Sequence, residues 1–184
     1  MTELTLLAEE VGVNERTLRR AVNQGTLNGA RPTPRSLRLS LPERHYIRRS
    51  WPLLSALRSA LRTEQNVRCA VLFGSTATGE DTPNSDIDIL VDLRNPSLER
   101  IVDLSEKLTA SIGRRVDLIR LEDAEADPWF LADVLSEGRV LVDRDGLWPR
   151  LRRRAAAQRC RGRQQETRRA KNALIGIDRL LTNS

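Results

Sequence analysis

Residues 71–93 read VLFGSTATGEDTPNSDIDILVDL, and this stretch decides the fold of the chain. It begins inside an apolar run that ends at Gly74, which is typical of a buried strand closed by a turn. After a polar segment, Asp86 and Asp88 open a second apolar run. Alternate side chains on a strand project from the same face, so the two carboxylates should point together. The stretch therefore predicts two buried strands, the second of which carries a pair of acidic side chains on one face.

This acidic pair, together with the turn before it, predicts a site for a metal ion and a phosphate. Two neighbouring carboxylates repel each other, and a bound divalent cation removes that cost. Paired oxygen ligands with room for phosphates are what magnesium takes in phosphoryl-transfer sites. Gly74 lets phosphate oxygens approach the backbone amides, Ser75 adds a hydroxyl donor, and a helix beginning in residues 76–80 would also favour an anion. The alternative is that Asp86 and Asp88 merely solvate one face of a sheet.

Asp117 is a third carboxylate, set between Val116 and Leu118 in a third apolar run where a strand ordinarily carries Val or Ile. We interpret it either as a third metal ligand or as a general base that takes a proton from an incoming hydroxyl group. Alternatively, it pairs with Arg114 or Arg115 at a strand edge.

The order of the remaining elements predicts an α/β middle part flanked by helical segments. A connecting helix is expected over residues 42–61, a second helix over 98–112, a third strand over 116–119, a short helix over 128–135 and a last strand over 139–142. We predict four parts: a DNA-binding domain (1–42), a connecting helix (43–64), a catalytic domain (65–146) and a basic helical tail (147–184).

The first 25 residues predict a helix-turn-helix. Apolar residues at three- and four-residue steps over 4–11 give one buried helix face, and Gly12 ends that helix. Asn14 is a good N-cap for a second helix, which Gly25 ends. DNA contacts are predicted on the outward side of this second helix, at Arg16, Thr17, Arg19 and Arg20.

The segment after this helix pair predicts a wing. Residues 36–41 alternate between polar and apolar, as a short hairpin does. Residues 4–41, with EEVGVNERTLRRAVNQGTL supplying the two helices, resemble the small winged helix of MerR-like and excisionase-like DNA-binding domains. The resemblance implies operator DNA as a partner, and the alternative is a helical hairpin with a structural or partner-binding role.

The turn and the acidic pair also carry a resemblance to a known family. Gly74-Ser75, ten further residues and then Asp86-Ile87-Asp88 resemble the G-S-x10-D-x-D signature of the DNA polymerase β-like nucleotidyltransferases. The spacing is similar to that of the minimal nucleotidyltransferases (MNT) of HEPN/MNT toxin-antitoxin modules. The likeness spans residues 67–142, with Asp117 matching the third carboxylate of the family.

This resemblance implies a fold, a set of ligands and a reaction. It implies that Asp86, Asp88 and Asp117 bind two Mg²⁺ ions and that Gly74 and Ser75 hold ATP or another NTP. The implied fold is α+β with an α/β core: a winged helix-turn-helix followed by a small nucleotidyltransferase domain with a short mixed sheet and flanking helices. One departure is that many close members carry an arginine two or three residues after the serine, where this chain has Ala77 and Thr78.

Composition and charge limit the remaining choices. Hydrophobic residues make up 39% of the 184 residues and charged residues 30%, which is too polar for a membrane span, and we expect a cytoplasmic protein. The two cysteines indicate neither a disulfide framework nor a zinc site. The net charge of +6 favours polyanionic partners. The arginine-rich stretch after residue 148 is either a solvated helix or an arm that binds a phosphate backbone or a partner, and we favour the arm.

These observations lead to one main hypothesis and two alternatives. The main hypothesis is a magnesium-dependent nucleotidyltransferase that moves AMP or another NMP to a protein or RNA hydroxyl group. By resemblance, it is an antitoxin that modifies a HEPN toxin and represses its own operon. The first alternative, favoured by Ala77 and Thr78, is a DNA-binding regulator that only senses nucleotide or forms a homo-oligomer. The second is a toxin that adds nucleotides to tRNA.

Overall fold

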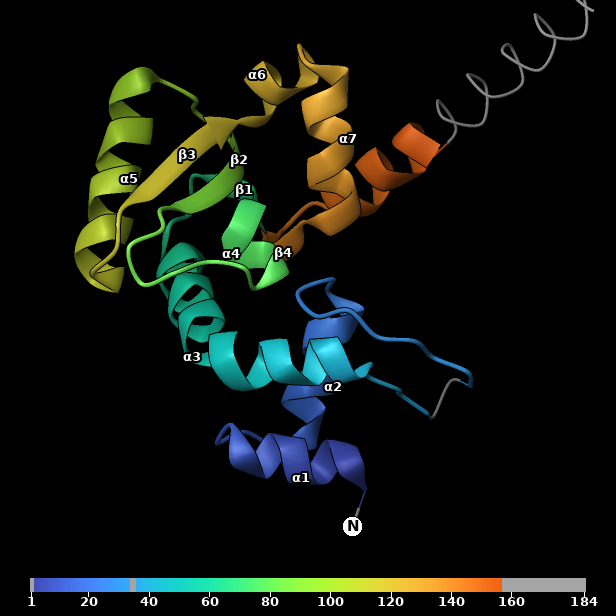
Figure 1. The fold of residues 1–184 in the computed structure, drawn as a ribbon. Helices are drawn as coiled ribbons and strands as arrows, with labels where there is room; N and C mark the ends of the chain where they lie inside the picture. Colours follow the sequence, from blue (N-terminus) through green and yellow to red (C-terminus); the bar gives the residue numbers. More distant parts are fainter. Residues whose placement is uncertain (1, 34–35, 157–184) are drawn as a thin grey trace, which may run out of the picture. The chain divides into compact units, whose positions relative to one another are not determined.

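Four strands form one mixed sheet in the computed structural model, which describes residues 2–33 and 36–156 (Figure 1). They are β1 (Val67–Phe73), β2 (Ile87–Leu93), β3 (Val116–Arg120) and β4 (Arg139–Asp143), in the order β3-β2-β1-β4. β1 pairs antiparallel with β2 and β4, and β2 pairs parallel with β3. The strands lie where the apolar runs place them, so the predicted mixed sheet is confirmed.

The two central strands carry the core of the sheet. Six of the seven residues of β1 are buried, and in β2 only Asp88 and Asp92 are less than fully buried. A strand covered on both faces has this near-continuous apolar sequence, which explains why the runs are readable without alternation.

Helix α5 (Leu98–Ile112) makes the crossover that the parallel pairing of β2 and β3 requires. Ser97 caps its amino terminus, and Gly113 ends it with a left-handed φ of 74°. α5 contacts β3, the long helix α3 (Leu41–Thr63) contacts β4, and the two helices contact each other, so they lie side by side along the sheet (Figure 1).

Two short helices precede β4. α7 (Pro128–Glu137) matches the helix predicted over 128–135, and Asp127 caps it. α6 (Leu121–Glu125) is not predicted by the sequence, because five residues reading LEDAE are too few to show a helical period. Helix α4 (Gly74–Thr78) follows β1 directly and begins two residues earlier than predicted.

The amino-terminal segment contains two helices joined at Gly12. α1 (Glu3–Glu10) and α2 (Glu15–Asn23) have the predicted bounds to within a residue or two, and the Asn14 side chain accepts a hydrogen bond from the Thr17 amide as an N-cap. Leu4, Leu7, Leu18 and Ala21 are buried, as the periodicity predicts.

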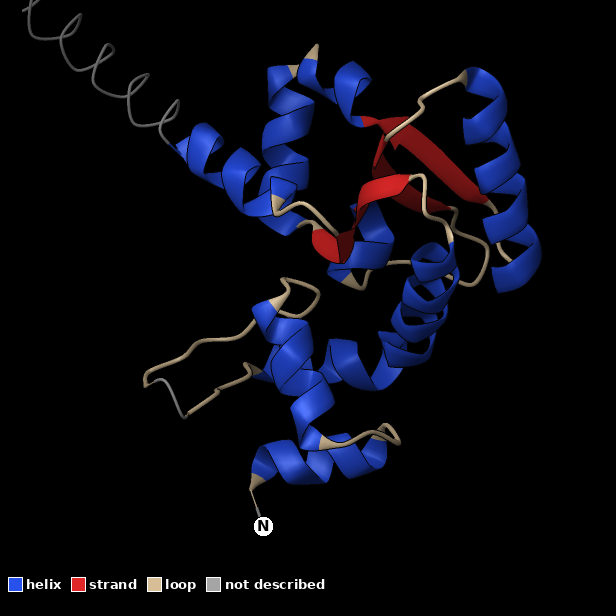
Figure 2. Ribbon diagram, turned by 180° about the vertical axis from the view of Figure 1, so that it is seen from behind, coloured by secondary structure: helices blue, strands red, loops and turns tan. Residues whose placement is uncertain are grey.

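The predicted wing is shorter than expected. Within the described residues between α2 and α3, strand pairing is limited to one antiparallel bridge between Ala30 and Arg38, and Figure 2 shows the segment mostly as loop. Pro32 supplies no amide donor to a ladder, and Ser40 instead caps the start of α3. Leu41, which the alternation would bury, is exposed.

The amino-terminal segment docks onto the edge strand β4. The Val140 amide donates to the Gly25 carbonyl oxygen at 3.0 Å, and the Thr26 hydroxyl donates to the Val140 carbonyl oxygen at 2.6 Å. Both amino-terminal helices therefore belong to the same compact unit as the sheet, Met1–Leu147. The domain limits at residues 42, 64 and 146 remain predictions.

A second unit begins at Trp148. Residues 148–156 are helical, and the rest of the predicted basic tail lies outside the described residues. Among the helices that the structure describes, none has the length and apolar character needed to cross a membrane.

Candidate active site

Gly74 lies where β1 ends and α4 begins, against the carboxylate of Asp88. The antiparallel register pairs Phe73 with Asp88, which brings the next residue, Gly74, alongside that aspartate. A Cβ atom at Gly74 would lie 2.7 Å from Oδ2 of Asp88, and the glycine has a left-handed φ of +69°. The site therefore needs glycine here for its backbone conformation and for the space its missing side chain leaves.

The three predicted carboxylates gather at one end of the sheet. Asp88 and Asp117 are direct partners in the parallel register of β2 and β3, so their side chains project from the same face, and Asp86 stands two residues before Asp88. Burial, followed by the charges of Asp117 and Asp86, raises the pKa of Asp88. The register places Asp88 and Asp117 on one face with Asp86 near them, and that the three side chains together bind a metal stays a prediction.

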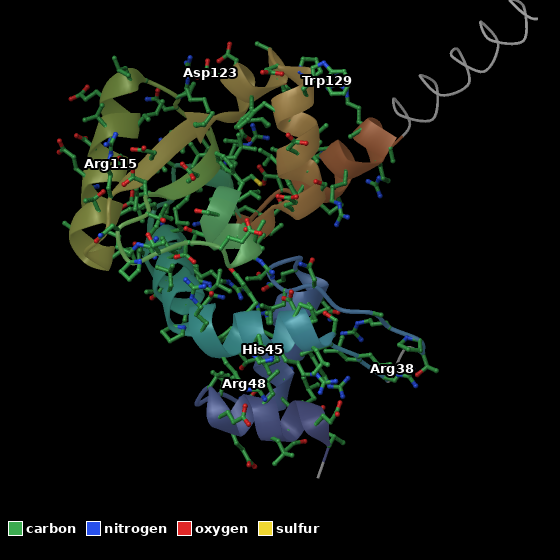
Figure 3. All side chains as sticks on the ribbon, viewed as in Figure 1. Arg38, His45, Arg48, Arg115, Asp123 and Trp129 are labelled. Carbon is green, nitrogen blue, oxygen red and sulfur yellow. The ribbon has the colours of Figure 1, made fainter. Side chains whose placement is uncertain are left out.

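Arg115 is the cation that faces this cluster. Its Nε lies 3.0 Å from Oδ1 of Asp117, and a terminal nitrogen lies 4.0 Å from Oδ2 of Asp86. The side chain of Arg115 is 70% exposed. Figure 3 shows Arg115 near the start of β3 and Asp123 past the other end of that strand. Arg115 thus pairs with Asp117 and approaches Asp86 from the solvent side, and its side chain is not buried between the two carboxylates. The alternative pairing of Asp117 with a neighbouring arginine is therefore observed with Arg115.

Arg114, the other arginine considered, points elsewhere. It donates to the Ser85 carbonyl oxygen at 2.7 Å and pairs with Asp81 at 2.9 Å. It fixes the loop between α4 and β2, which delivers Asp86 to the cluster. The Thr76 hydroxyl donates to the Asp86 carbonyl oxygen at 3.4 Å and holds the same loop from α4.

The donor set fits a divalent cation. All three side chains are hard oxygen donors, and burial together with the neighbouring carboxylates raises the pKa of Asp88, a cost of ionisation that a bound cation would lower. Within the described part of the chain, no three acidic, histidine or cysteine side chains already stand close enough to hold an ion.

The start of α4 presents its backbone to the same place. No side chain caps this helix, so its first amides have no side-chain partner. The Ser75 hydroxyl makes no hydrogen bond to any described residue, while the Ser75 carbonyl oxygen accepts from Gly79 and Glu80 at 2.9 Å. Gly74 and Ser75 thus offer donors without a protein partner beside the acidic cluster, and their binding of a phosphate stays a prediction.

The predicted DNA-contacting residues differ in whether their side chains already bond to a neighbouring residue. Arg16 and Arg20 are exposed on α2. Arg19 pairs with Glu15 at 2.5 Å, and the Thr17 hydroxyl donates to the capping Asn14 at 3.0 Å. Only the first two present unengaged side chains to a ligand.

A separate cleft of about 490 Å³ lies near α1, lined by residues that include Leu4, Leu37 and Arg38. None of its lining residues belongs to the acidic cluster or to the Gly74 turn. His45 is exposed on α3 (Figure 3).

Comparison with known proteins finds a matching family model, related sequences and a solved structure of similar fold. The family model described as polymerase beta, nucleotidyltransferase matches residues 55–146. The protein adenylyltransferase MntA of Thermococcus cleftensis is 44% identical over 68 residues, which are 36% of this chain and 69% of that protein. A putative protein adenylyltransferase of Methanocaldococcus jannaschii is 35% identical over 92 residues, 48% of this chain and 89% of that protein. The solved structure of a toxin-antitoxin with AMP-PNP matches at a TM-score of 0.50 and 20% identity, over 66% of this chain and 98% of that one.

Proposed function

Because this chain belongs to the polymerase beta nucleotidyltransferase family, we propose that it transfers AMP or another nucleoside monophosphate from an NTP to a hydroxyl group on a protein. The observation that carries the proposal is the register of β2 and β3, which sets Asp88 beside Asp117 and next to the turn at Gly74. The choice of a protein acceptor follows from relatives that are named protein adenylyltransferases.

In this proposal each residue has a defined role. Asp86, Asp88 and Asp117 would hold magnesium, which when bound would neutralise the charge of the triphosphate and of the departing pyrophosphate. Gly74 and Ser75 would orient the triphosphate through backbone amides and a hydroxyl group. The acceptor oxygen would then attack the α-phosphorus in line with the bond to the β-phosphate oxygen, which breaks. The alternative role of Asp117 is that of a general base, which would take the proton of the acceptor hydroxyl group.

A HEPN-type toxin is the acceptor we propose, which would make this chain the antitoxin. The toxin-antitoxin solved with AMP-PNP shares the fold, and the family resemblance of the Gly74–Asp88 motif points the same way. Two alternatives remain: a tRNA acceptor, and a regulator with weak or no catalysis, which Ala77 and Thr78 favour.

One assay separates these three. The full chain is incubated with Mg²⁺ and each labelled NTP, with a HEPN-type protein or with tRNA. We expect label on the HEPN protein. Label on tRNA 3′ ends would favour the toxin alternative, and nucleotide binding without transfer to either acceptor would favour the regulator.

The amino-terminal helices would add DNA binding to this activity. Arg16 and Arg20 are exposed on α2, and the chain carries a net charge of +6. We expect the Arg16→Ala, Arg20→Ala variant to weaken binding to DNA from its own operator region and to reduce the salt slope by about 2, one for each lost phosphate contact. The matched control is Arg100→Ala, an exposed arginine on α5 that lies outside the predicted DNA-binding segment. Equal loss in the control would mean that the whole surface binds non-specifically, and no loss in either would remove DNA from the proposal.

A further inference from the structure

Side chains from outside the family motif hold the far end of α4, the helix that carries Gly74 and Ser75. Five residues are too few for α4 to satisfy its own last carbonyl groups. The Tyr46 hydroxyl, from α3, donates to the Thr76 carbonyl oxygen at 3.1 Å. Nε of Arg139, from β4, donates to the Ala77 carbonyl oxygen at 2.6 Å. The carbonyl groups of two successive α4 residues are therefore held by two side chains that are distant in sequence.

Arg139 is itself fixed on every side. Its two terminal nitrogens bind both carboxylate oxygens of Glu43 at 2.7 and 3.0 Å, and the side chains of this pair are 6% and 5% exposed. Its guanidinium stacks 3.5 Å from the centre of the Tyr46 ring. A buried arginine with a bidentate ion pair and a stacked ring has little conformational freedom. It therefore holds the Ala77 carbonyl group in one position.

The same tyrosine also packs directly against the turn after α4. A Cβ atom added at Gly79 would lie 3.0 Å from the Tyr46 ring, and Gly79 has a left-handed φ of +87°. Arg49, one turn further along α3, donates to the Gly79 carbonyl oxygen at 2.6 Å. The contacts thus continue from α4 into the loop that leads to Asp86.

We propose that Glu43, Tyr46 and Arg139 are positioning residues for nucleotide binding. They fix α4 from its carbonyl end, so that the amides of Gly74 and the hydroxyl of Ser75 face the triphosphate. The proposal rests on the proposed function. It gives α3 a part in building the site, although Glu43 and Tyr46 precede the region that the family model matches. A purely structural role would be to anchor the amino-terminal segment, and the two roles make different predictions.

Two variants test the role without leaving a buried charge unpaired. Tyr46→Phe removes only the hydroxyl that binds Thr76. The double variant Glu43→Gln, Arg139→Met replaces a buried ion pair by neutral groups of similar size, which proteins tolerate far better than the loss of one partner. The matched control is Thr26→Val, which removes a buried hydroxyl bonded to Val140 in the same cluster but touches no α4 carbonyl.

We expect KM for the nucleotide to rise about threefold to tenfold in Tyr46→Phe and by roughly tenfold or more in the double variant, as the loss of one or more hydrogen bonds predicts. kcat should fall less than KM rises, because the acidic cluster is untouched. Hydrogen exchange of the amides in residues 74–78, measured without nucleotide, should speed up in both variants. Thr26→Val should lower the melting temperature and leave both KM and this exchange unchanged.

The KM and exchange of Tyr46→Phe, compared with those of Thr26→Val, decide between the two roles. Unchanged KM and unchanged exchange in Tyr46→Phe overturn the proposal, even if the double variant fails to fold. An equal change in Thr26→Val also overturns it, because the effect would then be general loosening. If the wild-type chain binds no nucleotide, the proposed function fails, while exchange in residues 74–78 still decides whether these side chains position α4.

Discussion

The Asp86→Asn, Asp88→Asn variant is expected to lose nucleotide transfer by about 1,000-fold or more while keeping its fold. Both residues lie on the face shared with Asp117, and amides bind divalent cations far more weakly than carboxylates do. A metal ion supplies several kcal/mol of charge stabilisation in such reactions, and about 4 kcal/mol corresponds to three powers of ten in rate. The measurement is initial rate of label transfer at saturating Mg²⁺, with binding of Mg²⁺ followed by calorimetry.

The stability of the single variant Asp88→Asn provides an independent check on the same cluster. Burial and the neighbouring carboxylates raise the pKa of Asp88, so the folded chain holds this proton more tightly than the unfolded chain. Wild-type stability should therefore fall as pH rises from the ordinary aspartate pKa to the raised one, and stay lower above it. With chelator present, the melting temperature of Asp88→Asn relative to wild type should increase from acidic to neutral pH.

Asp92→Asn is the matched control for the transfer assay. Asp92 is also on β2, but it pairs with Arg68 of β1 at 3.3 Å and has no contact with the acidic cluster. Its transfer rate should equal that of the wild type. Comparable loss in this control would mean that any lost charge on β2 is harmful. Full activity in Asp86→Asn, Asp88→Asn would show that these residues do not bind the catalytic metal.

The sheet and the acidic cluster could be predicted because their signals are local. Buried strands are short apolar runs ended by a glycine or a polar loop, and the period of two places Asp86 and Asp88 on one face. The predicted class of enzyme, a nucleotidyltransferase, is confirmed by the family match over residues 55–146. The two helices before Gly25 were equally readable, since their caps and buried residues lie within a few positions of each other.

What the sequence did not reveal depends on contacts between distant residues. Glu43 and Arg139 are separated by 96 positions, and each on its own looks like an ordinary charged residue of a helix or strand. Nothing local distinguishes their buried pair from a solvent-exposed one. The wing was overestimated for a related reason: an alternating pattern indicates a strand only if a partner supplies the ladder, and here the next residues begin α3.

The partner of Asp117 at the site itself was also not determined from the sequence. The sequence offered Arg114 and Arg115 as equal partners for Asp117. Arg115 comes directly before β3 and pairs with Asp117, two residues further on, whereas Arg114 pairs with Asp81. Continuing the two-residue alternation of β3 back to residue 115 would have favoured Arg115 over Arg114 as the partner of Asp117.

Gly74→Ala is expected to reduce transfer by about 100-fold, the scale of loss seen when catalytic groups are displaced by about 1 Å. An alanine in the left-handed conformation costs roughly 1–2 kcal/mol, which lowers stability without touching chemistry. At Gly74 there is a second effect, because the new Cβ would lie 2.7 Å from Oδ2 of Asp88. Either the carboxylate moves away from Asp117 or the backbone of the phosphate-binding turn shifts.

Gly113→Ala separates these two effects. Gly113 ends α5 with a φ of +74°, close to the +69° of Gly74, but a Cβ there would meet nothing within 4 Å. Both variants should lose stability in urea denaturation, since both place alanine in the same backbone region, and Gly74→Ala should lose at least as much because its new Cβ atom also meets Oδ2 of Asp88. Only Gly74→Ala should lose transfer and Mg²⁺ affinity, because only there does the methyl group meet a carboxylate. If both variants kept full activity, the contact between Gly74 and Asp88 would not be needed for catalysis. If both lost it, loosening of the sheet, and not the position of one carboxylate, would account for the effect.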